Sequence, residues 1–159
     1  MKNTEIFYIN KDFYNKNEKL SLKLIDALMP GAISDLTFQL NGGVVFVVIT
    51  HNNEPATIGR FCPVDNRKYM YIARQIDTLP KHQGKGLGTL CLENGCKFLL
   101  KNYACKRVIS SVDNENIASQ RMHEKAGFTK LEKSFYTKTR YSWNGAYIYR
   151  KDIKNETQK

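Results

Sequence analysis

A glycine-rich segment, Gln83-Gly84-Lys85-Gly86-Leu87-Gly88, stands directly before a stretch with helical periodicity. Glycines allow the backbone to approach a bulky anion closely. The start of a helix adds unsatisfied N–H groups and the positive end of the helix dipole, and both favour a phosphate group. Lys81, His82 and Lys85 add positive or partly positive side chains. The segment therefore predicts a binding site for a diphosphate.

Two common phosphate motifs do not describe this segment. A Walker A loop requires Ser or Thr directly after its Gly-Lys pair, whereas Lys85 is followed by Gly86 and Leu87. A dinucleotide-binding fingerprint requires G-x-G-x-x-G after an early strand, whereas these glycines alternate strictly at 84, 86 and 88. A flexible loop that merely precedes a helix is the structural alternative.

A second block runs from Asn116 to Phe128 and ends in His-Glu-Lys-Ala-Gly-Phe. Together the two blocks resemble the GNAT superfamily of acyl-CoA-dependent N-acyltransferases. In that family the pattern Q/R-x-x-G-x-G/A binds the CoA diphosphate, and it lies on Gln83, Gly86 and Gly88 here. The second family block has an Asn shortly after a strand and a helix ending in a phrase like Y-E-K-x-G-F, which Asn116 and residues 123–128 fill.

The resemblance implies that acetyl-CoA is the co-substrate. Its acetyl group would pass to a primary amine, of a small molecule or a protein, by direct attack on the thioester. A backbone N–H near Ile76 or Asp77 would stabilise the oxyanion of the tetrahedral intermediate. No metal is expected. The residues expected to hold the cofactor are Ile76, Thr78, Gln83, Gly84, Lys85, Gly86, Leu87, Gly88, Thr89, Asn116, Ser119 and Lys125.

His123 is the expected general acid for the departing thiolate, because it stands where many family members have a tyrosine. An unperturbed histidine titrates near neutrality and can donate a proton. A histidine that only packs beside the cofactor, or a reaction with no dedicated acid, is the alternative. Asn116 is expected to hydrogen-bond the pantetheine arm, and a helix N-cap role is compatible with that.

The general base is expected to be Asp77. Family members that deprotonate an ammonium often keep a glutamate on the third strand, at a position that falls near Ile72 here. Asp77 is the only carboxylate from Asn66 to Pro80, and Glu93 follows on the next helix, so either they act through water or the acceptor arrives already neutral. Arg74 offers a guanidinium for an acceptor carboxylate, against the more common role of a solvated or ion-paired strand arginine.

Periodicity and turn residues predict the elements that position these groups. A helical stripe ends at Pro30-Gly31, an irregular stretch follows, and three consecutive strands suggest a meander. Tyrosines and one tryptophan at 136, 141, 143, 147 and 149 crowd the last two strands, where one or two would line the acceptor pocket. The expected helices are 12–29, 86–101 and 116–126, and the expected strands are 44–50, 56–61, 69–76, 107–112, 128–138 and 145–152.

This order, with the resemblance, predicts an α/β (α+β) fold: a three-layer sandwich whose mixed central sheet is splayed between its fourth and fifth strands. Residues 1–40 carry no motif, although in relatives this part forms a strand and helices that shape the acceptor pocket. We expect one domain over residues 1–153 and a polar tail over 154–159.

Composition predicts a folded protein that favours anionic ligands. Of its 159 residues, 42% are hydrophobic and 25% charged, and the net charge is +10. The longest apolar run, Val44–Ile49, is too short to cross a membrane, and the N-terminus lacks a signal-peptide core, so we expect a cytoplasmic protein. The four cysteines form no C-x-x-C pair, which predicts reduced thiols and no zinc site.

Two other functions compete with acyl transfer. A non-catalytic acyl-CoA sensor would keep the glycine turn and lose the acid and base. A nucleic-acid-binding domain would explain the charge and the Lys and aromatic residues interleaved over 128–149, but the sequence shows no helix-turn-helix, zinc finger or RNP-like phrase. A homodimer is possible, since dimers are common among relatives.

Overall fold

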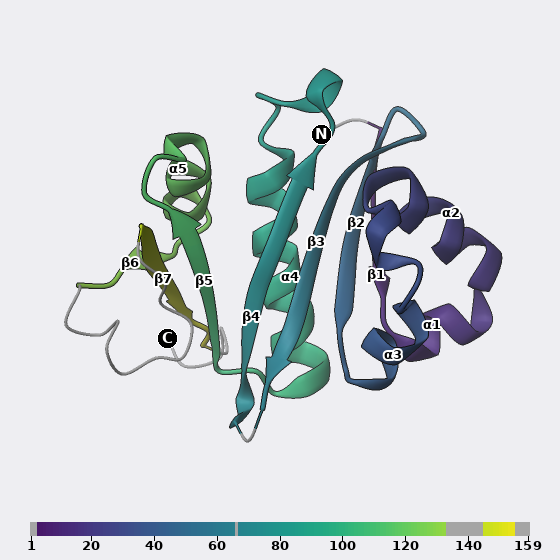
Figure 1. Cartoon of the computed structure of the whole chain (residues 1–159), viewed down its shortest axis with the longest axis horizontal. Helices are drawn as coiled ribbons and strands as arrows, with labels where there is room; N and C mark the ends of the chain where they lie inside the picture. The colour runs from purple at the N-terminus through teal and green to yellow at the C-terminus, as the bar shows by residue number, and fades with distance from the viewer. Residues whose placement is uncertain (1–2, 66, 133–144, 155–159) are drawn as a thin grey trace.

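The computed structural model describes residues 3–65, 67–132 and 145–154. Within these residues, seven strands form one sheet in the order β1-β2-β3-β4-β5-β7-β6 (Figure 1). The strands are β1 (Thr4–Ile9), β2 (Val45–His51), β3 (Glu54–Val64), β4 (Arg67–Thr78), β5 (Arg107–Asp113), β6 (Thr129–Lys130) and β7 (Ala146–Asp152).

The sheet is mixed, as predicted. The first four strands form an antiparallel meander in chain order. β4 and β5 are parallel neighbours, whereas β5, β7 and β6 pair antiparallel. The connection between β4 and β5 contains α4, because parallel neighbours need a crossover.

Helices cover both faces of the sheet, which confirms the three-layer arrangement. In Figure 1, α1, α2 and α3 lie on one side of β1–β3, and α4 lies on the other. The helices are α1 (Lys11–Lys16), α2 (Glu18–Leu28), α3 (Leu36–Asn41), α4 (Leu87–Tyr103) and α5 (Ile117–Lys125), with short 3-10 turns η1 (Pro30–Ala32) and η2 (Pro80–His82).

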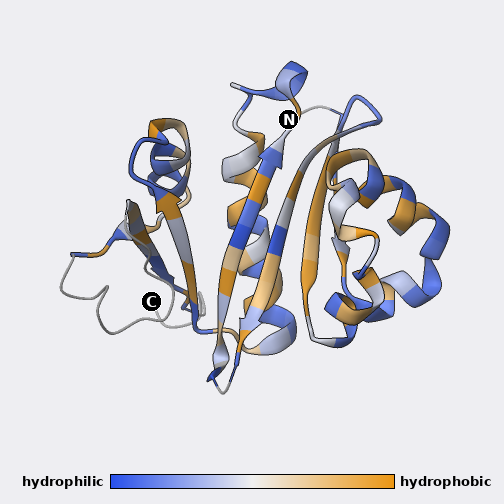
Figure 2. Ribbon diagram, in the orientation of Figure 1, coloured by the Kyte–Doolittle hydropathy of each residue, from blue (hydrophilic) through white to orange (hydrophobic). Residues whose placement is uncertain are grey.

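β2 is buried on both faces, as its continuous apolar sequence predicts. Val45, Val47 and Ile49 pack in the core that includes α4, and Phe46 and Val48 pack in the core that includes α2 and α3. Figure 2 shows hydrophobic residues along β2 and hydrophilic ones on the outer side of α2. The central strands are therefore fixed from both sides, which gives the functional residues of β4 a rigid support.

The prediction of one helix over 12–29 is wrong. The segment forms α1 and α2, separated at Asn17, where φ is −139° and ψ is 44°. The stretch before residue 41, expected to be irregular, contains α3, whose Leu36 and Leu40 are buried in the core. The helices α1 and α3 are short, and tertiary packing stabilises short helices more than their own helix propensity does.

The predicted strand 128–138 is represented by β6 alone, and residues 133–144 lie outside the described part of the chain. Tyr136, Tyr141 and Trp143 lie outside it too, whereas Tyr147 and Tyr149 lie on β7. Three of the four cysteines are buried, and burial raises the pKa of Cys96 to about 12. Among the helices in the described ranges, none is long and apolar enough to cross a membrane.

Candidate active site

The glycine-rich turn leads directly into α4. Gly84 and Gly86 both have a φ of 74°, a left-handed conformation that costs other residues about 1–2 kcal/mol. Gly86 is the N-cap residue of α4, and no side chain caps this end. The Gln83 amide donates from Nε2 to the Thr78 carbonyl at 3.2 Å, which ties the turn to the end of β4. The first N–H groups of α4 have no intrahelical acceptor and point out of the helix end.

α5 begins at the second predicted block. The backbone N–H of Ser119 donates to Asn116 Oδ1 at 3.0 Å, so Asn116 is the N-cap of this helix. The cap uses the carbonyl oxygen, and an asparagine keeps its Nδ2 amide as a donor. Ala118, Met122 and Lys125 follow at helical spacing and therefore share one face of α5.

A pocket of about 610 Å³ lies between the turn, the start of α4 and α5. All of the predicted cofactor-binding residues except Lys85 line it. Arg121 and Lys125 give it two cationic side chains, and none of the described lining residues is acidic, so it suits an anion. We call it the turn pocket, and it is lined by Ile76, Thr78, His82, Gln83, Gly84, Gly86, Leu87, Gly88, Thr89, Asn116, Ala118, Ser119, Arg121, Met122 and Lys125.

Sequence reasoning missed Ala118, Arg121 and Met122 as lining residues. Their helical spacing could have identified them, because these positions are three or four residues from Lys125 or from each other on one helix. For His82 the sequence suggested only a partly positive side chain near the glycine-rich turn, whereas the structure places it in the pocket lining. It is 5% exposed, and neither ring nitrogen has a hydrogen-bond partner among the described residues. Burial, reinforced by the positive charges of Lys85 and Lys81, lowers the pKa of His82.

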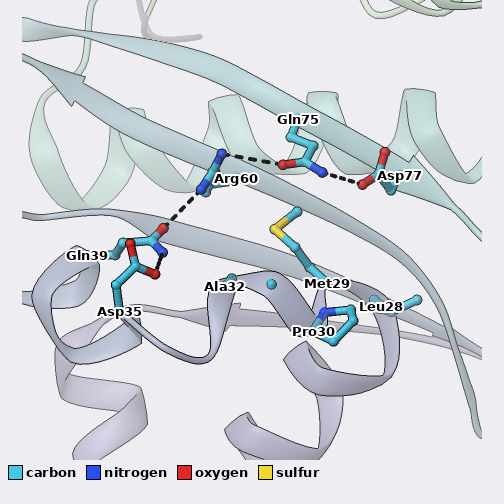
Figure 3. Close-up of a pocket in the computed structure, with 10 residues that line it drawn as sticks. Leu28, Met29, Pro30, Ala32, Asp35, Gln39, Arg60, Gln75 and Asp77 are labelled. Carbon is cyan, nitrogen blue, oxygen red and sulfur yellow. Dashed lines mark hydrogen bonds between the residues drawn. The ribbon is translucent and has the colours of Figure 1, made fainter.

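A second pocket, of about 440 Å³, lies against the other face of β4 (Figure 3). Gln75 and Asp77 of β4 line this pocket, whereas Ile76 and Thr78 line the turn pocket. Successive side chains of a strand point to opposite faces, so the two pockets lie on opposite sides of one strand. We call it the arginine pocket, and it is lined by Leu28, Met29, Pro30, Gly31, Ala32, Asp35, Gln39, Arg60, Gln75 and Asp77.

The predicted catalytic residue Asp77 lies in the arginine pocket, apart from the predicted cofactor residues. Its Oδ2 accepts a hydrogen bond from Gln75 Nε2 at 2.7 Å. Ile72 is 7% exposed in a small apolar cluster. Glu93 and Arg74 line neither pocket, and Arg74 is exposed. Asp77 is therefore the carboxylate of β4 that faces this pocket.

The sheet opens between β4 and β5, which confirms the predicted splay. The parallel ladder runs from Met70 to Ile72 of β4 and stops there, although β4 continues to Thr78. Beyond the ladder the Ser110 hydroxyl lies 3.0 Å from the Ala73 carbonyl, in position to donate to it. The later part of β4 thus keeps backbone groups that no strand on this side pairs.

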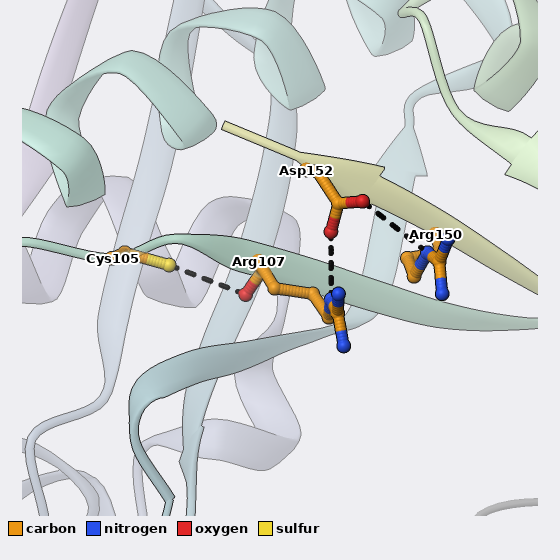
Figure 4. Close-up of polar contacts among 4 residues, drawn as sticks. All are labelled: Cys105, Arg107, Arg150 and Asp152. Carbon is orange, nitrogen blue, oxygen red and sulfur yellow. Dashed lines mark hydrogen bonds and ion pairs between the residues drawn. The ribbon is translucent and has the colours of Figure 1, made fainter. Parts of the chain in front are cut away.

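β5 stays attached to β7 along its whole length. Near the end of β5 that is still paired with β4, Asp152 of β7 forms ion pairs with two arginines (Figure 4). Its Oδ1 lies 2.7 Å from Arg107 Nε, and its Oδ2 lies 3.6 Å from Arg150 Nε. These contacts support β5 from the side opposite β4, so the opening is confined to the β4–β5 pair.

His123 lies inside the protein and does not line either pocket. The ring is 2% exposed, with Nδ1 2.8 Å from the Ser119 carbonyl and Nε2 2.8 Å from the Ser110 hydroxyl. A carbonyl can only accept, so Nδ1 carries a hydrogen. Burial lowers the pKa of His123 and favours the neutral ring, in which Nε2 can only accept. The single Ser110 hydrogen is then directed either to Nε2 or to the Ala73 carbonyl. Only the imidazolium form has a proton to release at Nε2.

A mixed sheet that opens between two parallel strands, with an uncapped helix start beside the opening, is the fold of GNAT-like acyltransferases. The sequence matches the profile of the Acetyltransferase (GNAT) family over residues 9–128. The protein therefore belongs to this family, whose members catalyse acyl transfer that depends on acetyl-CoA. No curated protein matches the chain.

Solved structures with the same fold cover nearly the whole chain. A GNAT family acetyltransferase from Elizabethkingia anophelis with acetyl-CoA bound is 17% identical, with a TM-score of 0.65, over 96% of this chain and 100% of that one. A Bacillus subtilis acetyltransferase in complex with CoA is 15% identical, with a TM-score of 0.64, over 95% and 99%. RimL, the ribosomal L7/L12 α-N-protein acetyltransferase, is 15% identical, with a TM-score of 0.68, over 98% of this chain and 97% of that one.

Proposed function

We propose that the protein is an N-acetyltransferase that moves the acetyl group of acetyl-CoA to a primary amine by direct attack on the thioester. The observation that carries the proposal is the position of the turn pocket. It combines an uncapped helix start and two cationic side chains with the unpaired end of β4. CoA is long and anionic, so it needs one phosphate anchor and one groove for its amide-rich arm, and this pocket offers both.

The diphosphate binds at the turn from Gln83 to Thr89, where the first N–H groups of α4 donate to it. Lys85 adds charge from outside the pocket wall, and Lys125 adds charge from α5. The pantetheine arm follows β4 past Thr78 and Ile76, opposite Asn116 and Ser119 of α5. Structural neighbours with acetyl-CoA or CoA bound support this use of the fold.

The amine approaches from the arginine pocket, because that pocket reaches the same part of β4 from the other face. Asp77 takes the proton of the ammonium, directly or through water, and the free amine forms a C–N bond to the acetyl carbon. A backbone N–H near Ile76 or Asp77 donates to the oxyanion. The C–S bond then breaks, the nitrogen of the new amide releases its second proton to solvent, and the CoA thiolate takes up a proton.

In our proposal His123 supplies that last proton through the Ser110 hydroxyl, 2.8 Å from its Nε2, and then through water, because neither residue lines either pocket. This role requires the imidazolium form. Replacing His123 by Phe should lower turnover and flatten its pH dependence. Unchanged turnover across pH would remove the role from His123 and leave a reaction in which the thiolate departs without a dedicated acid.

An acyl-CoA sensor without catalysis is the second candidate. It is favoured by one observation, that both ring nitrogens of His123 already have partners inside the protein. A sensor would bind acetyl-CoA and release no free thiol with any amine.

The test combines a thermal shift with a thiol-release assay. Acetyl-CoA at about 100 times its Kd should stabilise the protein by about 2.7 kcal/mol. The Gly86→Val variant should lose this shift, because valine is strained at a φ of 74° and fills the turn. Gly145→Val is the matched control, since Gly145 has a φ of 92° and open space around its Cβ but lies outside the turn pocket.

Both variants should lose a similar amount of stability without ligand. If acetyl-CoA fails to shift the wild type, the proposed function is wrong. If acetyl-CoA shifts the wild type and no amine releases thiol, the sensor is the better description.

A further inference from the structure

Arg60 of β3 lies at the centre of the arginine pocket without a carboxylate partner (Figure 3). Its terminal nitrogens donate to Gln39 Oε1 at 3.3 Å and to Gln75 Oε1 at 3.4 Å. These distances exceed the usual range for N–H···O bonds, and both acceptors are neutral amides. Among the residues that the structure describes, the buried Nε has no hydrogen-bond partner and no ion pair includes Arg60.

The two carboxylates of the pocket are kept one residue away from this guanidinium. Gln39 donates to Asp35 Oδ1 at 2.6 Å, and Gln75 donates to Asp77 Oδ2 at 2.7 Å. Each glutamine therefore turns its amide nitrogen to a carboxylate and its oxygen to Arg60. The result is a row in which a cation stands between two anions and is separated from each by a neutral amide.

A half-buried guanidinium with only weak neutral acceptors is incompletely compensated. Two of its five N–H groups are used, and a planar carboxylate is the group that pairs with a guanidinium in two parallel hydrogen bonds. The pocket therefore has room and donors for one carboxylate at Arg60.

The same pocket provides for an amine at its other end. Asp77 attracts an ammonium, and its neighbour in sequence, Ile76, lines the turn pocket. Between Arg60 and the opposite wall, the lining comes from the apolar residues Leu28, Met29 and Ala32. We propose that the acceptor is an amino-acid-like zwitterion, with its carboxylate on Arg60 and its primary amine toward Asp77. This inference rests on the proposed N-acetyltransferase function and names its substrate class.

Other classes of amine are less compatible with this arrangement of charges in the arginine pocket. A polyamine would place a second cation near Arg60, where the like charge repels it. A phosphate or sulfate ester would bring a second negative charge close to Asp35 and Asp77. A protein N-terminus has the amine but lacks a carboxylate next to it, so Arg60 would still have no carboxylate partner.

The first measurement compares matched acceptors. The common α-amino acids and β-alanine are assayed with acetyl-CoA by thiol release, and the best of them is compared with its carboxamide and with the amine left after decarboxylation. We expect kcat/KM to fall at least tenfold from acid to carboxamide, with the decarboxylated amine as poor or poorer, because hydrogen bonds to a charged acceptor are the stronger ones. A better rate with the decarboxylated amine, or with a peptide N-terminus, would overturn the proposal.

The second measurement changes Arg60. Arg60→Met keeps an unbranched side chain up to the position of Nε and removes the charged guanidinium, and should lower kcat/KM for the amino acid about 30- to 100-fold. The fall in kcat/KM that Arg60→Met causes for the decarboxylated amine should be at least tenfold smaller than the fall for the amino acid. Arg60→Lys keeps the charge without the planar fork and should give an intermediate loss. Arg74→Met is the matched control, since Arg74 is exposed and lies outside both pockets.

The outcomes separate this inference from the function on which it rests. An acetyl-CoA thermal shift retained in Arg60→Met shows that the variant folds and that the turn pocket is intact. If no acceptor is acetylated, calorimetric titration of the amino acids into protein saturated with CoA still tests the site, and binding must disappear in Arg60→Met. A carboxylate-specific loss in Arg74→Met, or equal losses for acid and amine in Arg60→Met, would show that Arg60 does not hold the carboxylate.

Discussion

The two pockets on either side of β4 are built from different kinds of polar group. The turn pocket offers backbone N–H groups at a helix start, with Arg121 and Lys125 on its rim and no acidic group in its described lining. The arginine pocket offers polar side chains, with one cation between two anions. The first arrangement suits a large anion, whereas the second suits a ligand that carries both signs of charge.

This difference explains why the sequence predicts the turn pocket and does not predict the arginine pocket. A backbone site depends on glycine positions and a helix start, and those appear as a contiguous motif at residues 83–88. A side-chain site can be assembled from any elements that meet. Here Asp35 of the segment before α3, Arg60 of β3 and Asp77 of β4 meet in one pocket. The glycine turn is thus local in sequence, and the polar residues of the arginine pocket are not.

The largest expected effect comes from changing the charge of the turn pocket while leaving the arginine pocket unchanged. Reversing two charges together, Arg121→Glu with Lys125→Glu, should raise the KM for acetyl-CoA about 100-fold, because two charge-assisted contacts become repulsive. The KM for the acceptor should change much less. The matched control, Lys97→Glu with Lys101→Glu, makes the same change at exposed positions with the same spacing on α4, away from both pockets. An equal effect in the control would mean that only the net charge matters.

A tenfold effect is expected where α4 and α5 approach each other. A Cβ added at Gly88 would lie 2.4 Å from the Met122 sulfur, and both residues line the turn pocket. Gly88→Ala should push that side chain into the pocket and lower acetyl-CoA affinity about tenfold, a cost of about 1.4 kcal/mol. Adding Met122→Ala should restore the affinity. Failure of the second change to restore it would place the steric contact outside the cofactor path.

A smaller effect is expected on stability at low pH, and it arises on the turn-pocket side of the sheet. Burial lowers the pKa of both His82 and His123, so their protonated forms are favoured in the unfolded chain. Stability is unaffected by these groups well above the ordinary histidine pKa and is lost as the pH falls through about 6.5. Each ring should therefore lower the unfolding free energy progressively as the pH falls below about 6.5.

Chemical denaturation at several pH values measures this slope. His123→Gln keeps a donor for Ser119 and an acceptor for Ser110, so the fold should persist while the slope below pH 6.5 decreases. His82→Gln should reduce the slope in the same direction. An unchanged slope in both variants would show that neither histidine is buried in its neutral form.

The smallest effect sharpens the description of the arginine pocket. Asp35→Asn removes a negative charge while its side-chain oxygen still accepts from Gln39. The affinity for a carboxylate-bearing acceptor should rise about two- to threefold, as is usual for exposed charges, and acetyl-CoA binding should not change. Asp26→Asn, at an exposed position of α2 outside the pocket, is the control. A weaker affinity in Asp35→Asn would mean that Asp35 contacts the amine end of the acceptor.

The sequence by itself determined the strand meander, α4, β5, α5 and the glycine turn that lines the turn pocket. These features depend on local rules: apolar periodicity, glycine at left-handed positions and an asparagine cap. Gly84, Gly86 and Asn116 each satisfy their rule within a few residues, and the structure brings them to one pocket. The family followed from the same two contiguous blocks.

Only the tertiary structure decided which face of β4 each side chain occupies. Strict alternation from Ile72 would place Arg74 and Ile76 on the side of the arginine pocket. A register shift pairs Arg60 with Gln75 and the next residue of β3 with Ala73, so Arg74 is an extra residue and the alternation reverses after it. Gln75 and Asp77 therefore face Arg60, and Ile76 faces the turn pocket. A bulge depends on pairing with the neighbouring strand, which no local pattern of β4 encodes.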